Sequence, residues 1–326
     1  MCVGGLVADV ITGPLEKLPR DGELVILKTM KLFRGGCAAN TGYGLARLGI
    51  PVSVIGKVGA DFFGDFVREN LRQSGVRTDR IIRDPKINST SCVVLITPDG
   101  ERSFCYHPGA TETLNDTDLK KSGWAKAPAG SVLHVATPSK LARLNIKALL
   151  REAKRKKLVT TMDLDGNADD KWVKGVWAAL PHTDILFCNF AEGKTLTGKN
   201  TPEEISRAIL RYAVKQLVLK FGASGSMLVT PGGPVKVAGH KVRAVDGTGA
   251  GDLFVSGFLA WALKKGLLSK PLWAKSEMQE ILQFANLCGA TCVTQVGASL
   301  GSATFGSLQK LKQKVYGKPG PLRSIH

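Results

Sequence analysis

The chain has 326 residues, of which 44% are hydrophobic and 22% are charged, with 37 glycines spread along its length. This composition excludes an intrinsically disordered chain and a fibrous repeat, and the length is ample for a large hydrophobic core. There are 45 Lys and Arg residues against 27 Asp and Glu residues, a formal net charge of +18, which raises the question of a nucleic-acid partner.

Short apolar runs alternate with amphipathic segments along the chain. The runs predict buried strands at residues 2–8, 52–58, 132–136, 159–163, 185–188, 217–220 and 227–229. The amphipathic segments predict helices at about 38–48, 61–74, 140–157, 169–180, 202–214, 251–265 and 276–294. Strands that are apolar on both faces and alternate with helices predict an α/β fold, with a central, mainly parallel sheet covered by helices on both faces in a Rossmann-like arrangement. No repeat or long linker divides the sequence, so we expect one domain, residues 1–326, with a frayed tail from residue 317.

Two segments interrupt this alternation of strands and helices. Residues 11–34 alternate in polarity without helix caps, and residues 88–107 are typical of a hairpin that turns at residues 98–100, Pro-Asp-Gly. We expect both to form antiparallel strands outside the main sheet. Together they would make a small β lid over one edge of the core.

No segment is predicted to cross a membrane or to direct secretion. The longest nearly apolar stretch, Leu253–Leu263, has 11 residues, whereas a transmembrane helix needs about 20. Residues 1–9 lack a basic segment and reach an acid at Asp9, so a buried strand is favoured over a signal peptide. The seven cysteines contain no Cys-x-x-Cys pair, which favours buried thiols in a reducing cytoplasm over disulfides or a zinc site.

The densest basic segment is residues 140–157, with eight basic residues and one acid, Glu152. Basic residues recur every four positions from Arg143 to Arg155, and apolar residues such as Leu144 take the opposing positions, as in an ordinary amphipathic helix. We interpret the surplus as a solvated helix face, with a nucleic-acid patch as the alternative. Nucleic acid is therefore not an expected partner.

The strongest local motif is Asp246-Gly-Thr-Gly-Ala-Gly-Asp252, directly before an apolar helix. Its glycines leave backbone N–H groups uncovered at the positive end of the helix dipole, which predicts an anion cradle suited to phosphate. It is neither a Walker loop nor a Gly-x-Gly-x-x-Gly motif. The alternative is a tight turn with Asp252 as the helix N-cap. The dipole predicts a pKa for Asp252 at or below about 3.9.

Two weaker motifs precede it. In Arg34-Gly-Gly-Cys-Ala-Ala-Asn40 the diglycine lets a ligand approach the main chain, and Asn40 can donate to and accept from hydroxyls. The alternative is a helix entry whose Asn bonds its own backbone. Asn189-Phe-Ala-Glu192 follows a predicted strand at the sheet edge where open α/β sheets bind ligands. Its acid can hold a water or Mg²⁺, or cap its own helix.

These three motifs, with Asp9 before them, resemble the ribokinase (PfkB) family of carbohydrate kinases in their order and separations. The resemblance covers nearly the whole chain. It implies a ribokinase-type fold and ATP-dependent transfer of the γ-phosphoryl group to a hydroxymethyl group of a sugar or sugar-like substrate, in the cytoplasm. The implied cofactors are ATP, Mg²⁺ and K⁺, the implied partner is a small-molecule sugar, and a homodimer would form through the lid strands.

The resemblance also implies roles for individual residues. The acceptor hydroxyls would be held by Asp9, Gly35, Gly36, Asn40 and Asp252, with Asp252 as catalytic base. The transferred phosphoryl group would lie in an anion hole formed by Gly249, Ala250 and Gly251. The nucleotide site would include Asn189, Lys220, Gly222, Gly225, Gly249, Gly251 and Asn286. Glu192 would hold Mg²⁺ through water, and Asp246 would hold a monovalent cation.

The sequence departs from the family pattern at two positions. Gly247 replaces a Thr that family members commonly carry, so one hydroxyl contact beside the phosphates is missing, and either another basic group compensates or turnover is slower. Gly301 ends the loop 296–301, which resembles the second half of the cation site, where Ser or a similar residue is expected. We therefore expect K⁺ to assist activity without being required.

The acceptor is less sharply defined than the reaction. Asp9 and Asn40 would suit vicinal hydroxyls of a sugar, a sugar acid or a nucleoside, and the lid residues Phe104, Tyr106 and His107 can face either a sugar or a base. The alternative for His107 is a surface position without a substrate contact. With only 6% aromatic residues, a sugar is favoured over a nucleoside. Alternatives are a nucleoside kinase of the same family and a catalytically weakened kinase-like protein that binds nucleotide or nucleic acid. A Rossmann-type oxidoreductase ranks last, because the first strand lacks the required glycine spacing.

Overall fold

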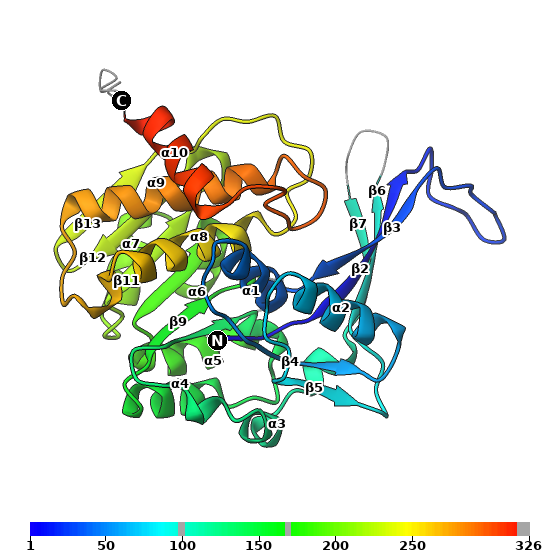
Figure 1. Cartoon of the computed structure of the whole chain (residues 1–326), viewed down its shortest axis with the longest axis horizontal. Coiled ribbons are helices and arrows are strands. Elements are labelled where there is room, and N and C mark those ends of the chain that lie inside the picture. The colour runs from blue at the N-terminus through cyan, green and yellow to red at the C-terminus, as the bar shows by residue number, and fades with distance from the viewer. Residues whose placement is uncertain (97–101, 167–170, 318–326) are drawn as a thin grey trace.

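The computed structural model describes residues 1–96, 102–166 and 171–317. These residues form a large sheet with helices on both faces, and a smaller sheet projects from one side (Figure 1). The predicted turn at residues 98–100, the beginning of the helix predicted from residue 169 and the tail from residue 318 lie outside the described residues.

The large sheet has nine strands. They are β1 (Cys2–Val3), β4 (Val54–Gly59), β5 (Ile81–Asp84), β8 (Val132–Ala136), β9 (Val159–Asp163), β10 (Ile185–Asn189), β11 (Gln216–Lys220), β12 (Ser226–Thr230) and β13 (Gly233–Val237). Their order is β13-β12-β11-β10-β9-β8-β1-β4-β5, and the strands from β11 to β5 run parallel, while β12 pairs antiparallel with both β11 and β13. The predicted mainly parallel sheet is confirmed. The short edge strands β5 and β13 were not predicted.

Two layers of helices cover this sheet because neighbouring strand residues point to opposite faces. In β10, for example, Phe187 packs into one core cluster and Leu186 into the other. One layer contains α1 (Cys37–Arg47), α2 (Phe62–Gln73), α8 (Ala250–Lys264), α9 (Lys275–Cys292) and α10 (Phe305–Tyr316). The other contains α3 (Asp116–Lys121), α4 (Ile146–Arg155), α5 (Lys171–Ala179), α6 (Phe190–Thr197) and α7 (Pro202–Leu210). Short 3₁₀ turns are η1 (Gly109–Thr113), η2 (Trp124–Lys126), η3 (Pro138–Lys140), η4 (Leu180–His182), η5 (Gly222–Ser224) and η6 (Leu267–Ser269).

The smaller sheet consists of β2 (Val7–Pro14), β3 (Met30–Gly35), β6 (Ser91–Ile96) and β7 (Arg102–His107), in the order β3-β2-β6-β7. It confirms the predicted lid strands as a separate sheet. One expectation was wrong, because β2 and β6 pair in parallel, although β2–β3 and β6–β7 are antiparallel. The β6–β7 hairpin therefore joins the sheet beside β2 through a crossover connection and does not continue an antiparallel meander.

Two further predictions need correction. The predicted strand at residues 2–8 ends at Val3, the chain bends at Gly4 and Gly5, and Asp9 consequently lies in β2 of the smaller sheet. The helix predicted at 140–157 begins only at Ile146, because Asn145 caps it by accepting a hydrogen bond from the N–H of Ala148.

Other expectations agree with the structure. The basic residues at 147, 151 and 155 of α4 are exposed, as expected for a solvated face. All seven cysteines are free thiols, five of them buried. Within the described ranges, no helix is both long and apolar enough to span a bilayer.

Candidate active site

The carboxyl ends of β9, β10 and β11 meet the N-terminus of α8 at one edge of the large sheet. Parallel pairing places Asn189 beside Lys220, and β9 ends at Asp163 in the adjacent strand. The ammonium of Lys220 lies 2.7 and 3.0 Å from the two carboxylate oxygens of Asp163. Burial alone would lower the pKa of Lys220, but the carboxylates of Asp163 and Glu192 outweigh it and raise the pKa, so Lys220 stays charged. Sequence reasoning missed Asp163, although an acid in the last position of a predicted strand was the available signal.

Asp252 is a buried carboxylate in the first turn of α8. Its Oδ2 accepts a hydrogen bond of 2.9 Å from Nδ2 of Asn40, which lies in α1. The N-cap of α8 is Gly249, so the interpretation of Asp252 as N-cap is wrong. Burial raises the pKa of Asp252 above its usual value, against the hydrogen bond from Asn40 and the charge of Lys220. This direction is opposite to the one predicted from the helix dipole.

The side-chain oxygen of Asn40 is a candidate acceptor for a ligand. Its Oδ1 is buried and has no hydrogen-bond partner among the residues that the structure describes. A buried carbonyl oxygen without a donor costs free energy. The oxygen is therefore available for a hydroxyl group of a bound acceptor.

The side chain of Asp9 in β2 extends toward Gly35 of the neighbouring strand β3, although Asp9 itself pairs with Phe33. A Cβ atom on Gly35 would lie 1.9 Å from Oδ2 of Asp9, so only glycine leaves room for this carboxylate. Burial raises the pKa of Asp9 to about 6, and the charge of Arg34 opposes that rise. Gly36 follows as the N-cap of α1. The diglycine thus places a carboxylate near the entry of the helix that carries Asn40.

The predicted anion loop is shaped by its neighbours. Gly249 has φ of 72°, and a Cβ there would lie 2.2 Å from Cβ of Ala298. The carbonyl of Ala298 accepts a hydrogen bond from Arg34, whose guanidinium lies 3.9 Å from the ring centroid of Tyr43. On the other side, Nζ of Lys220 lies 3.3 Å from the position of a Cβ on Gly251. A fixed ammonium therefore lies beside the first amides of α8.

A cavity of about 660 Å³ opens next to this loop. Its walls come from residues 220–225, residues 239–247, the start of α8 and one side of α9. Five predicted nucleotide-site residues line it, namely Lys220, Gly222, Gly225, Gly251 and Asn286, whereas Gly249 and Asn189 do not. Oδ1 of Asn286 accepts from Oγ of Ser226 at 2.9 Å, so Asn286 also ties β12 to α9. The wall at 239–244 has no sequence pattern that could have predicted it.

Asn189 and Glu192 form a reciprocal capping box at the start of α6. The N–H of Glu192 donates to Oδ1 of Asn189, while the N–H and Nδ2 of Asn189 donate to the Glu192 carboxylate. The N–H of Gly166 adds a third donor to that carboxylate. The capping interpretation thus holds, and it leaves the carboxylate capacity for one further partner, since two oxygens offer about four lone-pair sites.

No group of three or more His, Cys, Asp or Glu side chains that could hold a metal occurs within the described residues. Mg²⁺ commonly binds through one or two carboxylates together with waters and substrate phosphates. Glu192 offers one such carboxylate.

Asp246 joins the two halves of the predicted cation site. Its Oδ1 accepts from the N–H and hydroxyl of Thr248 at 2.9 and 2.7 Å, and its Oδ2 accepts from the N–H of Gly297 at 2.8 Å. The loop that ends at Gly301 is therefore held against the anion loop.

The lid presents a tyrosine on the same side as Asp9. Paired residues share a face of a sheet, and Asp9 pairs with Cys92, which pairs with Tyr106. The ammonium of Lys140 lies 5.0 Å from the Tyr106 ring centroid. His107 is the next residue of β7 and lies on the opposite face, which agrees with the alternative that it is a surface residue. Sequence reasoning also missed Lys140, because it belongs to a short 3₁₀ turn inside a predicted helix.

Comparisons with known proteins agree with this geometry. Residues 1–304 match the pfkB family of carbohydrate kinases. The chain is 30% identical over 288 residues to the probable fructokinase-5 of Arabidopsis thaliana, covering 85% of this chain and 87% of that protein. Among solved structures, the apo form of a putative ribokinase II from E. coli has a TM-score of 0.81 at 23% identity, covering 96% of this chain and 98% of that one. The ribokinase of Arabidopsis thaliana complexed with ribose and ATP has a TM-score of 0.75 at 26% identity, covering 96% and 97%.

A ribokinase-type α/β fold with a buried carboxylate at a helix N-terminus defines a class of phosphotransferases that use an alcohol group as acceptor. The chain belongs to the pfkB family of carbohydrate kinases.

Proposed function

We propose that this protein transfers the γ-phosphoryl group of ATP to a hydroxymethyl group of a free sugar of the fructose or ribose type. The observation that carries the proposal is the buried Asp252 carboxylate, held by Asn40 between the Asp9 side of the site and the 660 Å³ cavity. The fructokinase and ribokinase names of the similar proteins support the choice of sugar.

Asp252 acts on the acceptor hydroxyl. Its raised pKa still leaves it a far weaker base than an alkoxide, so it aligns the hydroxyl in the ground state. As the new O–P bond forms, the attacking oxygen becomes acidic and the proton passes to the carboxylate. Asp9 accepts hydrogen bonds from other hydroxyls of the sugar, and Asn40 accepts one through its Oδ1.

The phosphoryl group lies against the amides of Gly249, Ala250 and Gly251, with the ammonium of Lys220 beside them. Phosphoryl transfer passes through a loose transition state, so positioning and charge stabilisation supply most of the catalysis. Mg²⁺, when bound, neutralises charge on the nucleotide phosphates, and Glu192 would hold it through water. A monovalent cation at Asp246 would hold the loop at Gly297 in place.

We also propose that the lid sheet carries a homodimer contact and that the protein works in the cytoplasm. Leu24 and Ile26, in the segment between β2 and β3, are 82% and 87% exposed, and Phe104 of β7 is 61% exposed. Exposed apolar residues gathered on one projecting unit favour an interaction surface. Light scattering should give twice the chain mass, and the double variant Leu24→Lys, Ile26→Lys should give a monomer.

The function is tested by incubating the protein with ATP and Mg²⁺ and measuring ADP release. Fructose, ribose, a sugar acid and a nucleoside serve as acceptors, and ³¹P NMR of the product identifies the phosphorylated carbon. We expect turnover with a free sugar, a primary phosphate ester as product and no turnover by Asp252→Asn. ADP release only with the nucleoside would refute the proposal. A rate of ADP release that no acceptor raises above the rate in water alone would also refute it.

A further inference from the structure

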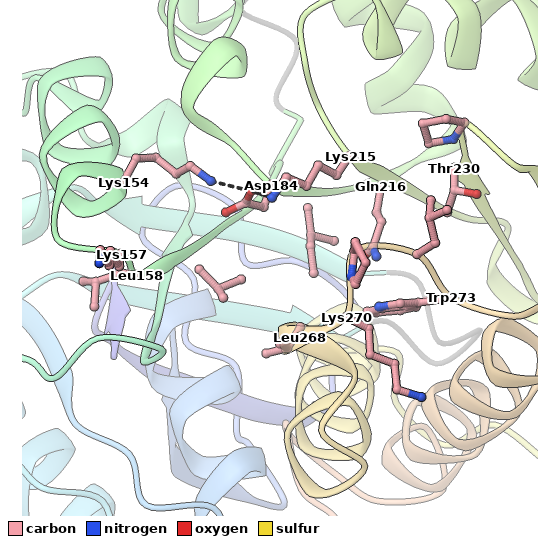
Figure 2. Close-up of a pocket in the computed structure, with 15 residues that line it drawn as sticks. Lys154, Lys157, Leu158, Asp184, Lys215, Gln216, Thr230, Leu268, Lys270 and Trp273 are labelled. Carbon is pink, nitrogen blue, oxygen red and sulfur yellow. Dashed lines mark hydrogen bonds and ion pairs between the residues drawn. The ribbon is translucent and has the colours of Figure 1, made fainter.

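A second cavity, of about 300 Å³, lies at the opposite ends of the strands that carry the active site (Figure 2). Its walls include Val159, Ile185 and Gln216, the first residues of β9, β10 and β11. The active-site residues lie at the last positions of these five-residue strands, four residues further on, about 13 Å away at 3.3 Å per residue. This cavity is therefore separate from the acceptor and nucleotide sites.

Four lysines from different elements line the cavity. Lys154 lies in α4 and Lys157 just after it, Lys215 precedes β11, and Lys270 follows η6. Figure 2 shows Lys154 and Lys215 on either side of Asp184. Four lysines on one concave site are more than a solvated helix face alone would supply, although the Lys270 ammonium is directed toward Glu277.

The carboxylates near these lysines do not neutralise them. Asp184 pairs with Lys154 at 2.6 Å and with Lys215 at 3.0 Å, and Lys270 pairs with Glu277. Lys157 has no ion-pair partner among the described residues. Four ammonium groups against two carboxylates leave a surplus of two positive charges.

Asp184 holds this arrangement in place. Its Oδ2 accepts hydrogen bonds of 3.0 Å from both the N–H and the hydroxyl of Thr160. The carboxylate is thus fixed to β9, and it holds Lys154 and Lys215 against the part of the cavity wall to which all three belong. A preorganised pair of ammonium groups loses less side-chain entropy when an anion binds.

The remaining wall is apolar. Leu268 and the indole of Trp273 line the cavity, and Leu272 is 70% exposed beside it. The indole N–H donates to the carbonyl of Leu267, which fixes the ring. The cavity is therefore suited to a ligand that has a charged end and a less polar body. Its volume lies at the small end of the range for ligand pockets, about 300–1,000 Å³.

We propose that this cavity binds a small phosphomonoester, with the phosphate on the lysines and the carbon skeleton against Trp273. A phosphomonoester carries close to two negative charges near neutral pH, about −1.5 to −2, which matches the surplus of the site. Inorganic phosphate offers the same charge without the carbon skeleton, so it would make no apolar contact with Trp273. The proposal does not depend on the catalytic assignment.

The test uses isothermal titration calorimetry on the full chain, with glucose 6-phosphate, glycerol 3-phosphate, inorganic phosphate and glucose as probes. A non-hydrolysable ATP analogue and Asp9→Ala are included so that binding to the active site is reduced. We expect saturable binding of at least one ester with Kd below about 1 mM, and at least tenfold weaker binding of inorganic phosphate and of glucose.

The variant Lys157→Gln, Lys270→Gln removes two ammonium groups but leaves Asp184 with both of its lysine partners. We expect it to weaken ester binding at least tenfold with an unchanged thermal midpoint. The control Lys120→Gln, Lys199→Gln removes the same charge from exposed positions outside the cavity. Equal binding by both variants, no saturable binding by either ester, or equal affinity for inorganic phosphate would each overturn the proposal.

Discussion

Replacing Gly35 by Ala should weaken productive binding of the acceptor while leaving the nucleotide site intact. The backbone at Gly35 is not left-handed, so alanine meets no conformational penalty there. The added Cβ would instead lie 1.9 Å from Oδ2 and 2.5 Å from Cγ of Asp9. Something must move, and the Asp9 side chain is the movable partner.

The size of the effect follows from that distance. An ordinary contact begins at 3.4 Å, so the carboxylate must shift by about 1.5 Å. A misplacement of about 1 Å in a positioning group can cost roughly 10²-fold in rate. We therefore expect kcat/KM for the sugar to fall about 10²-fold, or about 2.7 kcal/mol of transition-state stabilisation.

Steady-state kinetics with the sugar varied, and calorimetry with an ATP analogue, check this prediction. Gly5→Ala is the matched control, because its Cβ would have no contact closer than 3.7 Å. In an Asp9→Ala background, Gly35→Ala should add little, since the clashing group is gone. Unchanged kcat/KM in Gly35→Ala, or full additivity with Asp9→Ala, would refute the assignment of Asp9 to the acceptor.

Further predictions concern the other charged groups. Asp252→Asn should keep nucleotide binding and lower kcat by roughly 10²–10⁴, and near-normal kcat would leave Asp252 without a catalytic role. Replacing Na⁺ by K⁺ at constant ionic strength should raise activity through Asp246, and identical kinetics in both salts would remove the cation site. Because burial raises the pKa of Asp9 to about 6, kcat/KM for the sugar should fall below that pH, and Asp9→Asn should lack this limb. Since the folded pKa exceeds the value of about 3.9 expected in an unfolded chain, the free energy of unfolding should decrease as the pH rises from about 4 to 6, a slope that Asp9→Asn should remove. Lys220→Met should lower kcat by about 10²-fold, and unchanged kcat would exclude the ammonium from phosphoryl transfer.

The elements with strong periodicity could be predicted from the sequence, and those set by long-range pairing could not. Strand β9 begins and ends where its apolar run predicts. Strands β5 and β13 were not predicted because each is a short edge strand with few apolar residues. The local sequence pattern does not distinguish such a strand from a loop. Residue Asp9 was assigned to the wrong sheet because two glycines interrupt an otherwise continuous apolar run.

The site divides in the same way. Glycine-rich loops and strand ends can be recognised in the sequence, so the motifs Gly249–Asp252 and Asn189–Glu192 could be predicted as candidate site segments. The ion pair of Lys220 with Asp163 depends on the packing of strands β9 to β11, which no local motif encodes. The pKa of Asp252 was predicted in the wrong direction because the helix dipole is visible in the sequence, whereas burial by distant elements is not.

That ion pair bears on the departure at Gly247. The absent Thr hydroxyl would have added one neutral donor beside the phosphates, whereas Lys220 places a full charge beside Gly251 and keeps it there through Asp163. Charge-assisted hydrogen bonds are about twice as strong as neutral ones. If Lys220 compensates for Gly247, the two positions should be coupled. Gly247→Thr should change kcat less than threefold in the natural chain, yet restore about tenfold of the activity lost in Lys220→Met, since one donor would then replace another. Strict additivity of the two substitutions in a double-mutant cycle would show that the lysine and the missing hydroxyl act on different groups.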